Sequence, residues 1–396
     1  MKHSLERDEP SIFEVMGALA KKYDAINLAQ GIPDFSPPAV ALEAAGTSIR
    51  SGGNGYSSSI GMPGLRNAIA NHGALAGHFD PDHEITVVAG ATEGLLCALK
   101  ALTSPGDEVL VALPCYDFYP ALIALAGCKM VGVKLREEEN GLMFDKNLLE
   151  EALTSQTRVL LVNSPHNPSG HVLRKEEADL LADIAVSANL ILLCDEVYEH
   201  FCFDRAHISL GCDPRVRART VVVCAASKTF NLPGWRVGWV SAHAPLTRRI
   251  RTVHAAMTFC APSPLQVGVQ AALAHCASGE YLTNLKEEHE KRRDLMVRLI
   301  EAAGWRPLKP AGGFFIIAQA PEAFAEVAIN ELCIDMTMSG KVAALPIAEM
   351  STVVEANSRY ARFMFSRDLS TLEEAGRLLS AYTHIHNPHG THRFEN

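Results

Sequence analysis

The 396-residue sequence lacks several features that would assign it to other classes of protein. It has no apolar run near the ~18 residues that a membrane-spanning helix needs. Basic residues are in the minority, with 36 Lys and Arg against 45 Asp and Glu. The resulting net charge of −9 argues against a surface for nucleic acid or for an anionic membrane. The opening stretch, MKHSLERDEP, has no apolar segment of the kind that a secretory signal requires.

The cysteines are also informative, because ten are present but no CxxC pair occurs among them. They are spread through apolar segments, which predicts reduced core residues in a cytoplasmic protein. The closing stretch, THIHNPHGTHRFEN, contains four histidines. We interpret it as a polar terminus, and the sequence predicts no metal site.

Seven short apolar segments alternate with helical patterns. Continuous apolar strands that alternate with helices indicate a mostly parallel sheet covered on both faces, which is an α/β fold. The seven predicted strands lie within EITVVAGAT (84–92), DEVLVALPC (107–115), KMVGVKL (129–135), RVLLVNSP (158–165), LILLCDEVY (190–198), TVVVCAAS (220–227) and WRVGWVSA (235–242).

The alternation of apolar strands and helices ends at a long charged helical segment, which extends to about Gly304. Beyond it come GGFFIIAQ, KVAALPI and YARFMFS, separated by helical stretches, which indicate a smaller α+β layer. We therefore predict a large domain over residues 46–285. Residues 1–45 and 286–396 are predicted to form a small domain that includes the N-terminal segment.

Polar residues follow five of the predicted strands at the ends where α/β sheets bind ligands. The first of these ends opens a helix at Ala91 and Thr92, and the others carry Tyr116, Asn167, the pair Asp195 and Tyr198, and finally Ser227 and Lys228. A helix start and Arg236 are suited to binding a phosphate group of a ligand, and an aromatic side chain is suited to stacking on a flat ring. A buried carboxylate is suited to binding a cationic group, and a buried lysine amine can form a Schiff base with an aldehyde. Pyridoxal phosphate meets all of these demands.

The motifs NPSG (167–170), DEVY (195–198) and SKTFNLPGWRVGW (227–239) support the same conclusion. Together with INLAQGIPDFSPP, PAGGFFI and YARFMFS they resemble the class I/II aminotransferases, which have fold type I. Within that family the chain is most similar to kynurenine aminotransferases, glutamine transaminases and methionine aminotransferases. The resemblance covers nearly the whole chain, and it implies an aminotransferase that uses pyridoxal phosphate.

The resemblance also implies roles for residues around the cofactor ring. Lys228 would form the Schiff base with the cofactor and act as the general base. Asp195 would pair with the pyridine nitrogen, which makes the ring an electron sink. Tyr198 and Asn167 would hydrogen-bond the ring oxygen, and Tyr116 would stack on the ring.

Further roles concern the phosphate and the partner subunit. The resemblance implies a phosphate site of Ala91, Thr92, Ser227 and Arg236. Tyr56 would reach the phosphate from the partner subunit, which implies a homodimer. Many relatives have a phosphate-binding serine three residues before the lysine, where this chain has Ala225.

For the substrate, the resemblance implies that Arg362 binds the α-carboxylate, assisted by Asn167 and the backbone of Gly31. Ile32 stands where the kynurenine branch has phenylalanine. Aspartate aminotransferases add an arginine in the region that corresponds here to TFCAPSPLQ (258–266), which has no positive charge. We expect Arg248, Arg249 and Arg251, just upstream, to face solvent.

The sequence therefore predicts transfer of the amino group of a neutral amino acid, such as methionine, glutamine, leucine or an aromatic one, to a 2-oxo acid. Two alternatives stay open at this stage. The same cofactor could serve a lyase, a cyclase or an oxidase that acts on an amino acid in a biosynthetic pathway. A regulatory domain without catalysis would carry a DNA-binding module ahead of the fold, and here the family motifs begin by Ile26.

Overall fold

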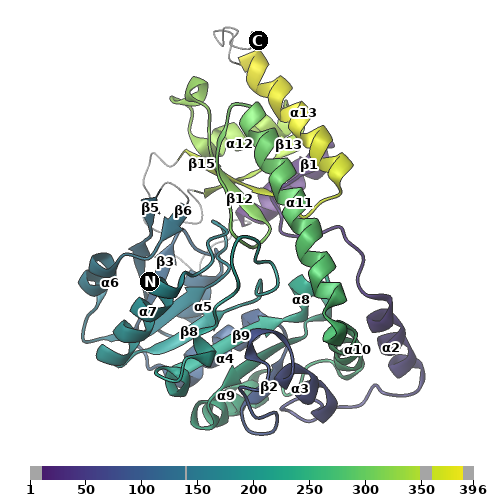
Figure 1. The fold of residues 1–396 in the computed structure, drawn as a ribbon, viewed down its shortest axis with the longest axis vertical. Helices are drawn as coiled ribbons and strands as arrows, with labels where there is room; N and C mark the ends of the chain where they lie inside the picture. The colour runs from purple at the N-terminus through teal and green to yellow at the C-terminus, as the bar shows by residue number, and fades with distance from the viewer. Residues whose placement is uncertain (1–10, 139–140, 348–358, 387–396) are drawn as a thin grey trace.

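The computed structural model describes residues 11–138, 141–347 and 359–386. Its larger region is built on a seven-stranded sheet (Figure 1). In spatial order the strands are β2 (Ile85–Val88), β10 (Gly238–Ala242), β9 (Thr220–Ala225), β8 (Ile191–Asp195), β7 (Thr157–Asn163), β3 (Glu108–Leu113) and β4 (Lys129–Lys134). Strand β10 runs opposite to the other six strands, which all run in one direction. The predicted mostly parallel sheet of seven strands is confirmed.

Both faces of this sheet are buried, because alternate side chains of each strand enter different cores. Val109 and Val111 of β3 pack with α4 (Ala91–Leu102), α5 (Tyr119–Leu125) and α9 (Ala244–Met257). Leu110 and Ala112 belong to the opposite core. The helices of that core are α2 (Ala39–Arg50), α3 (Pro63–Ala70), α6 (Lys146–Ala152), α7 (Lys175–Ser187) and α10 (Ser263–His275).

The smaller region has a four-stranded antiparallel sheet of its own. Its strands, in spatial order, are β11 (Arg306–Leu308), β12 (Phe315–Gln319), β15 (Tyr360–Met364) and β14 (Leu345–Pro346). A third core packs this sheet with α1 (Ile12–Tyr23), α11 (Glu280–Ala302), α12 (Ile329–Met338) and α13 (Leu369–His386). A short hairpin, β5 (Arg136–Glu138) and β6 (Gly141–Met143), projects from the larger region.

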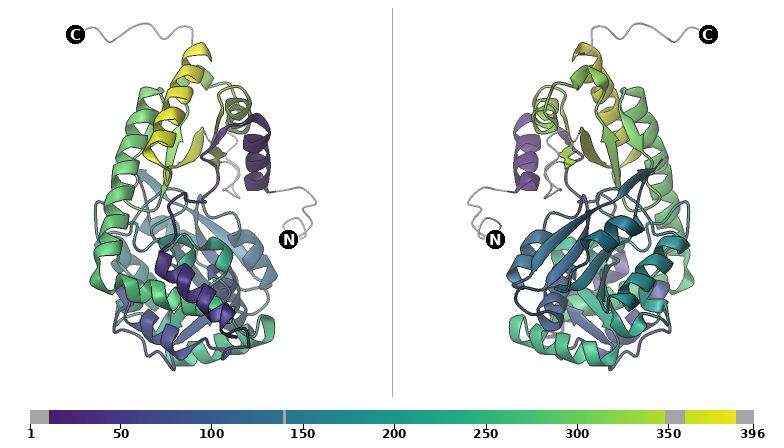
Figure 2. Two further views of the ribbon diagram at one scale, coloured as in Figure 1. Left: turned by 90° about the vertical axis from the view of Figure 1, so that its right-hand side faces the viewer. Right: turned by 90° about the vertical axis from the view of Figure 1, so that its left-hand side faces the viewer.

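The N-terminal segment is tied into the smaller region. Its strand β1 (Ile26–Asn27) pairs in parallel with β13 (Val342–Ala343), and Figure 2 shows α1 beside that region. The backbone N–H of Leu28 donates to Ala343 O over 2.9 Å, and the N–H of Met364 donates to Leu28 O over 2.8 Å. The segment thereby passes alongside the core strands of the smaller region.

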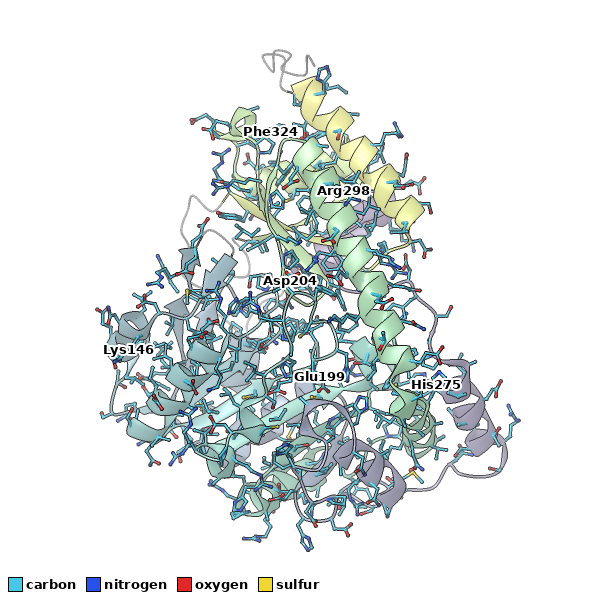
Figure 3. All side chains as sticks on the ribbon, viewed as in Figure 1. Lys146, Glu199, Asp204, His275, Arg298 and Phe324 are labelled. Atoms are coloured by element: carbon cyan, nitrogen blue, oxygen red, sulfur yellow. The ribbon has the colours of Figure 1, made fainter. Side chains whose placement is uncertain are left out.

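The long helix α11 connects the two regions (Figure 1). Its Arg293 side chain is buried and donates to Asp204 Oδ1 over 2.9 Å. Figure 3 labels Asp204 beside α11, where the two regions meet. The division at residues 45/46 and 285/286 stays a prediction. In the described part of the chain, no helix combines the length and apolar character that a membrane crossing demands. The stretches MKHSLERDEP and 387–396 lie outside the described residues.

Candidate active site

The lysine predicted to react lies just beyond the end of a central strand. Strand β9 ends at Ala225, and the short helix α8 (Ala226–Thr229) carries Lys228. Its Nζ donates to Gly31 O over 3.4 Å and lies 5.8 Å from the ring centroid of Tyr198. Burial and the nearby Arg362 guanidinium lower the pKa of Lys228 to about 8. At pH 7 roughly a tenth of this amine is therefore uncharged, which is far more than for an ordinary lysine.

The carboxylate of Asp195 lies at the end of the neighbouring strand β8 and is buried. The Tyr119 hydroxyl donates to its Oδ2 over 2.8 Å, and the N–H of Val197 donates to Oδ1 over 3.4 Å. Burial raises the pKa of Asp195 to about 6, although the hydrogen bond from Tyr119 opposes this shift. A cation beside the carboxylate would offset the cost of burying its charge.

Asn167 and Arg362 come from distant parts of the chain and meet in the interior. Arg362 Nη1 donates to Asn167 Oδ1 over 2.9 Å, and Nη2 donates to Ala29 O over 2.6 Å. The guanidinium carbon lies 3.9 Å from the ring centroid of Phe315. Only 1% of Arg362 is exposed, and its Nε has no hydrogen-bond partner among the described residues. A buried donor without a partner is costly, so it is suited to an anion that is bound only during function.

A second anion-binding feature lies at the start of α4. Gly90 precedes this helix with φ of 88°, and no side chain caps the free N–H groups of the first turn. A Cβ built on Gly90 would lie 2.3 Å from Arg236 Nη2. Glycine therefore lets the guanidinium approach the helix start, where an anion is favoured.

One cavity connects these features. Its walls include nine of the predicted site residues: Ala91, Thr92, Tyr116, Asn167, Asp195, Tyr198, Ser227, Lys228 and Arg236. An uncapped helix start with an arginine at one end, and a carboxylate and a lysine amine elsewhere in the walls, form a donor set that fits pyridoxal phosphate. Gly31 contacts Lys228, and Arg362 contacts Asn167, at the edge of this cavity.

Two predicted residues are not among the residues that line the cavity within this chain. Tyr56 is 90% exposed, and it contacts the ring of Phe259 edge-on with the centroids 5.4 Å apart. Ile32 is 52% exposed. The expectation that three upstream arginines face solvent holds for Arg248 and Arg249 but is wrong for Arg251. Arg251 is half-buried, because its guanidinium donates to Thr86 Oγ1 and Ile85 O over 3.1 and 2.7 Å.

Sequence reasoning missed three residues of the site. Tyr119 holds Asp195, and Asn163 donates from Nδ2 to Asp195 O while its Oδ1 accepts from the N–H of Asn167. Gly90 makes room for Arg236. Asn163 ends β7, so the rule that polar residues at strand ends form the site could have found it.

Comparison with known proteins decides the family of this chain. The model of the family "aminotransferase class I and II" matches residues 23–376. The chain belongs to the class I and II aminotransferases. It is therefore an enzyme with transaminase activity that uses pyridoxal phosphate, and the predicted fold type I is confirmed. The comparisons do not favour the lyase, cyclase or oxidase alternative.

Several aminotransferases are similar over nearly their full length. The chain is 35% identical to the probable N-succinyldiaminopimelate aminotransferase DapC of Mycobacterium tuberculosis, over 93% of this chain and 95% of that protein. The present structure and a solved structure of that Mycobacterium tuberculosis enzyme superpose with a TM-score of 0.89. The match covers 94% of this chain and 97% of the chain in the solved structure. The chain is 33% identical to the methionine aminotransferase of Escherichia coli, over 85% of this chain and 87% of that protein. It is 31% identical to kynurenine–oxoglutarate transaminase 3 of Mus musculus, over 92% of this chain and 86% of that protein.

Proposed function

We propose that this aminotransferase takes the amino group of a neutral L-α-amino acid, of the methionine, glutamine or aromatic type, and transfers it to a 2-oxo acid. The observation that carries the proposal is the buried Arg362 guanidinium beside Asn167, at the edge of the cavity that holds Lys228 and Asp195. An α-carboxylate is the anion that every such substrate has, and the unpartnered Nε of Arg362 supports this role.

The residues of the cavity have separate roles in this proposal. Ala91, Thr92, Ser227 and Arg236 bind the cofactor phosphate. Asp195, held by Tyr119, keeps a proton on the ring nitrogen. When bound, the cofactor supplies an aldehyde and a ring that withdraws electrons from the substrate α-carbon.

Three other side chains orient the ring. Tyr116 packs on its face, and Tyr198 donates to its oxygen. Asn167 Oδ1 already accepts from Arg362, so its Nδ2 is the group that donates to the ring oxygen. One asparagine would thereby join the cofactor to the residue that binds the substrate carboxylate.

Lys228 moves the proton. Its amine removes the α-proton of the substrate as general base and later returns a proton, a role that contributes roughly 10²–10⁴-fold to the rate. The pKa of about 8 supports this role because a base is most effective when its pKa is near the working pH. Gly31 O accepts from Nζ and helps to orient the amine.

The substrate class rests on what surrounds the side-chain end of the site. Residues 258–266 contain no positive charge, and Ile32, Tyr116 and Phe118 are apolar or amphipathic. A distal carboxylate left without a partner in such a pocket would cost several kcal/mol, with each 1.36 kcal/mol worth about tenfold in rate. Unbranched and aliphatic substrates fit better with Ile32 than kynurenine does.

A panel of amino donors tests this proposal. Values of kcat/KM are compared for methionine, glutamine, leucine, phenylalanine, kynurenine and aspartate with several 2-oxo acids. N-succinyldiaminopimelate is included because one relative is named for it. We expect the neutral donors to exceed aspartate by at least tenfold. A value for aspartate that equals or exceeds that for methionine would overturn the assignment.

Assembly and location belong to the same proposal. We propose a cytoplasmic homodimer in which Tyr56 reaches the phosphate site of the other subunit. The 90% exposure of Tyr56, next to the exposed ring of Phe259, supports a role that a second chain completes. All ten cysteines are unpaired, which supports a reducing compartment.

A further inference from the structure

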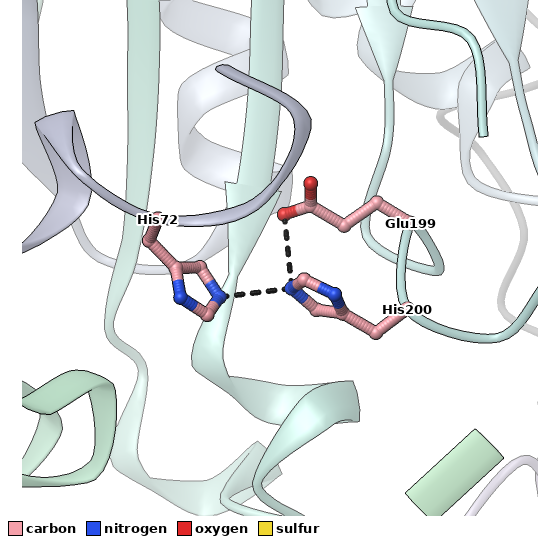
Figure 4. A group of neighbouring side chains, drawn as sticks. All are labelled: His72, Glu199 and His200. Atoms are coloured by element: carbon pink, nitrogen blue, oxygen red, sulfur yellow. Dashed lines mark hydrogen bonds and ion pairs between the residues drawn. The ribbon is translucent and has the colours of Figure 1, made fainter. Parts of the chain in front are cut away.

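A cluster of two histidines and one glutamate lies outside the cofactor cavity. His72 Nε2 and His200 Nε2 are 2.8 Å apart, and Glu199 Oε1 is 3.5 Å from His200 Nε2. Figure 4 shows the three side chains converging from two separate segments of the chain. One ligand atom from each residue lies within 4.8 Å of the others. None of the three residues is among those that line the cofactor cavity.

The cluster is largely shielded from solvent. Glu199 and His200 have side chains that are only 8% and 11% exposed. Histidine binds metal through the lone pair of a ring nitrogen and glutamate through a carboxylate oxygen, and these are the atoms that face one another in the cluster.

The backbone is shaped to bring the carboxylate against the histidines. Gly73, the first residue of the helical turn that follows α3, has φ of 65°, and a Cβ there would lie 2.4 Å from Glu199 Oε2. The N–H of Ala74 donates to this same oxygen over 3.3 Å. Glu199 Oε2 is thereby fixed, and Oε1 is turned toward His200. An outer hydrogen bond that orients a ligand in this way is typical of metal sites.

We propose that His72, Glu199 and His200 bind one divalent ion of the zinc type, with water in the fourth position. Two nitrogens and a carboxylate oxygen are ligands that Zn²⁺ and Co²⁺ accept. Metal–ligand distances near 2.1 Å in a tetrahedron put neighbouring ligand atoms about 3.4 Å apart. The distance from Glu199 to His200 already matches this value, and the two histidine nitrogens need to separate by only about half an ångström.

The ion would link segments that also serve the cofactor site. Glu199 and His200 follow Tyr198 directly, whereas His72 belongs to the loop after α3. The ring of His72 lies 6.4 Å from that of Phe230, two residues beyond Lys228. A bound ion would hold the turn that carries Tyr198 against this loop. The site differs from the sequence prediction, which contained no metal.

The test measures metal binding by the full-length holoenzyme and does not depend on its substrate. Co²⁺ is titrated while the visible absorption of tetrahedral cobalt is recorded, and Zn²⁺ is then added as competitor. We expect one cobalt ion per chain and its displacement by one equivalent of zinc. Substitution of His72→Gln or His200→Gln should weaken this binding at least tenfold.

The matched control is His83→Gln, because His83 is an exposed histidine beside Asp80 and can form only a weak surface site. This variant should bind cobalt as the wild type does. Unchanged binding in both cluster variants, or no stoichiometric binding by the wild type, would overturn the proposal.

A second measurement keeps the test decisive if a cluster variant does not fold. X-ray absorption at the zinc edge of the wild-type protein counts the imidazoles around the ion directly. Two imidazoles with oxygen neighbours support the assignment. Zero imidazoles, or four, would place the ion elsewhere and refute it. Aminotransferase activity toward any substrate has no bearing on this outcome.

Discussion

The buried carboxyl of Asp195 is arranged so that its ionisation controls binding of a protonated ring nitrogen. Its carboxyl has the Tyr119 hydroxyl and the Val197 N–H as hydrogen-bond donors, yet burial still raises its pKa to about 6. The carboxyl of Asp195 is mainly protonated when the pH is below this pKa and mainly ionised when the pH is above it. Only the ionised form can hold a proton on a ring nitrogen.

This balance gives the first prediction. The affinity of the apoenzyme for pyridoxal phosphate should be greatest above pH 6 and should fall as the pH decreases through about 6. Asp195→Asn should bind the cofactor roughly a hundredfold more weakly at pH 8, because it loses a buried charge pair. Equilibrium dialysis from pH 5 to pH 8 measures the cofactor affinity of the wild type and of the variant as a function of pH. The variant keeps the other titrating groups of the site, including Lys228 and the cofactor phosphate, so the difference between the two curves isolates Asp195.

Tyr119→Phe is the companion variant. The hydrogen bond from Tyr119 lowers the pKa of Asp195, so its removal should move the midpoint of the affinity curve to higher pH. A midpoint that stays in place would mean that Tyr119 does not influence this carboxyl.

The second prediction concerns Arg362. Arg362→Lys keeps a positive charge but loses the planar group that reaches Asn167, Ala29 O and an incoming carboxylate together. We expect kcat/KM to fall by at least a hundredfold, mainly through a higher KM. Cofactor affinity should change by less than threefold, since the hydrogen bond of Arg362 to the cofactor site goes to Asn167 and the variant keeps the positive charge near Lys228. A loss of cofactor with unchanged KM would contradict the proposed role.

Among the secondary-structure elements, the start of α4 is the most sensitive to a small change. The third prediction is that Gly90→Ala weakens cofactor binding by at least tenfold, because the new methyl group displaces the Arg236 guanidinium. The positive φ adds about 1–3 kcal/mol of strain. The control is Gly106→Ala, at φ of 93° with no atom within 4 Å of the added Cβ. It should lose stability in thermal unfolding but bind the cofactor normally.

The elements were predictable where the signal is local. All seven strands of the large sheet are short, apolar and continuous, so the sequence indicates them without knowledge of the fold. Polar residues at their ends then led to Lys228, Asp195 and Asn167. A lysine, a carboxylate or an amide at the end of a predicted strand indicates a ligand-binding role from the sequence alone.

Other features depend on contacts between distant segments. Tyr119 is important because α5 brings its hydroxyl to Asp195, 76 positions away. His72 and His200 are 128 positions apart, so no spacing in the sequence links them. Arg251 was expected on the surface because its neighbours are charged, but two acceptors on β2 bind it. None of these pairings has a local pattern from which it could be recognised.

For the whole molecule, the fourth prediction concerns the assembly. Lys228→Ala should abolish transamination, and Tyr56→Phe should greatly reduce it. If Tyr56 acts across the interface, mixed dimers contain one site with both native residues. Equal mixing and re-equilibration of the two variants should restore about a quarter of the wild-type activity, because half of the dimers are mixed and each has one native site. An active monomer at high dilution, or no recovery after verified exchange, would contradict this arrangement.

The N-terminal segment also limits when the enzyme can become active during its synthesis. Ala29 accepts from Arg362, which is 333 positions further along the chain, and β1 pairs with β13. At 5–20 residues per second, a ribosome needs roughly 15 to 65 s to make that intervening stretch. Gly31 and Ile32 leave the ribosome early but cannot dock until the last strand of the smaller sheet has emerged. A nascent chain should therefore show no transaminase activity until β15 has left the ribosome.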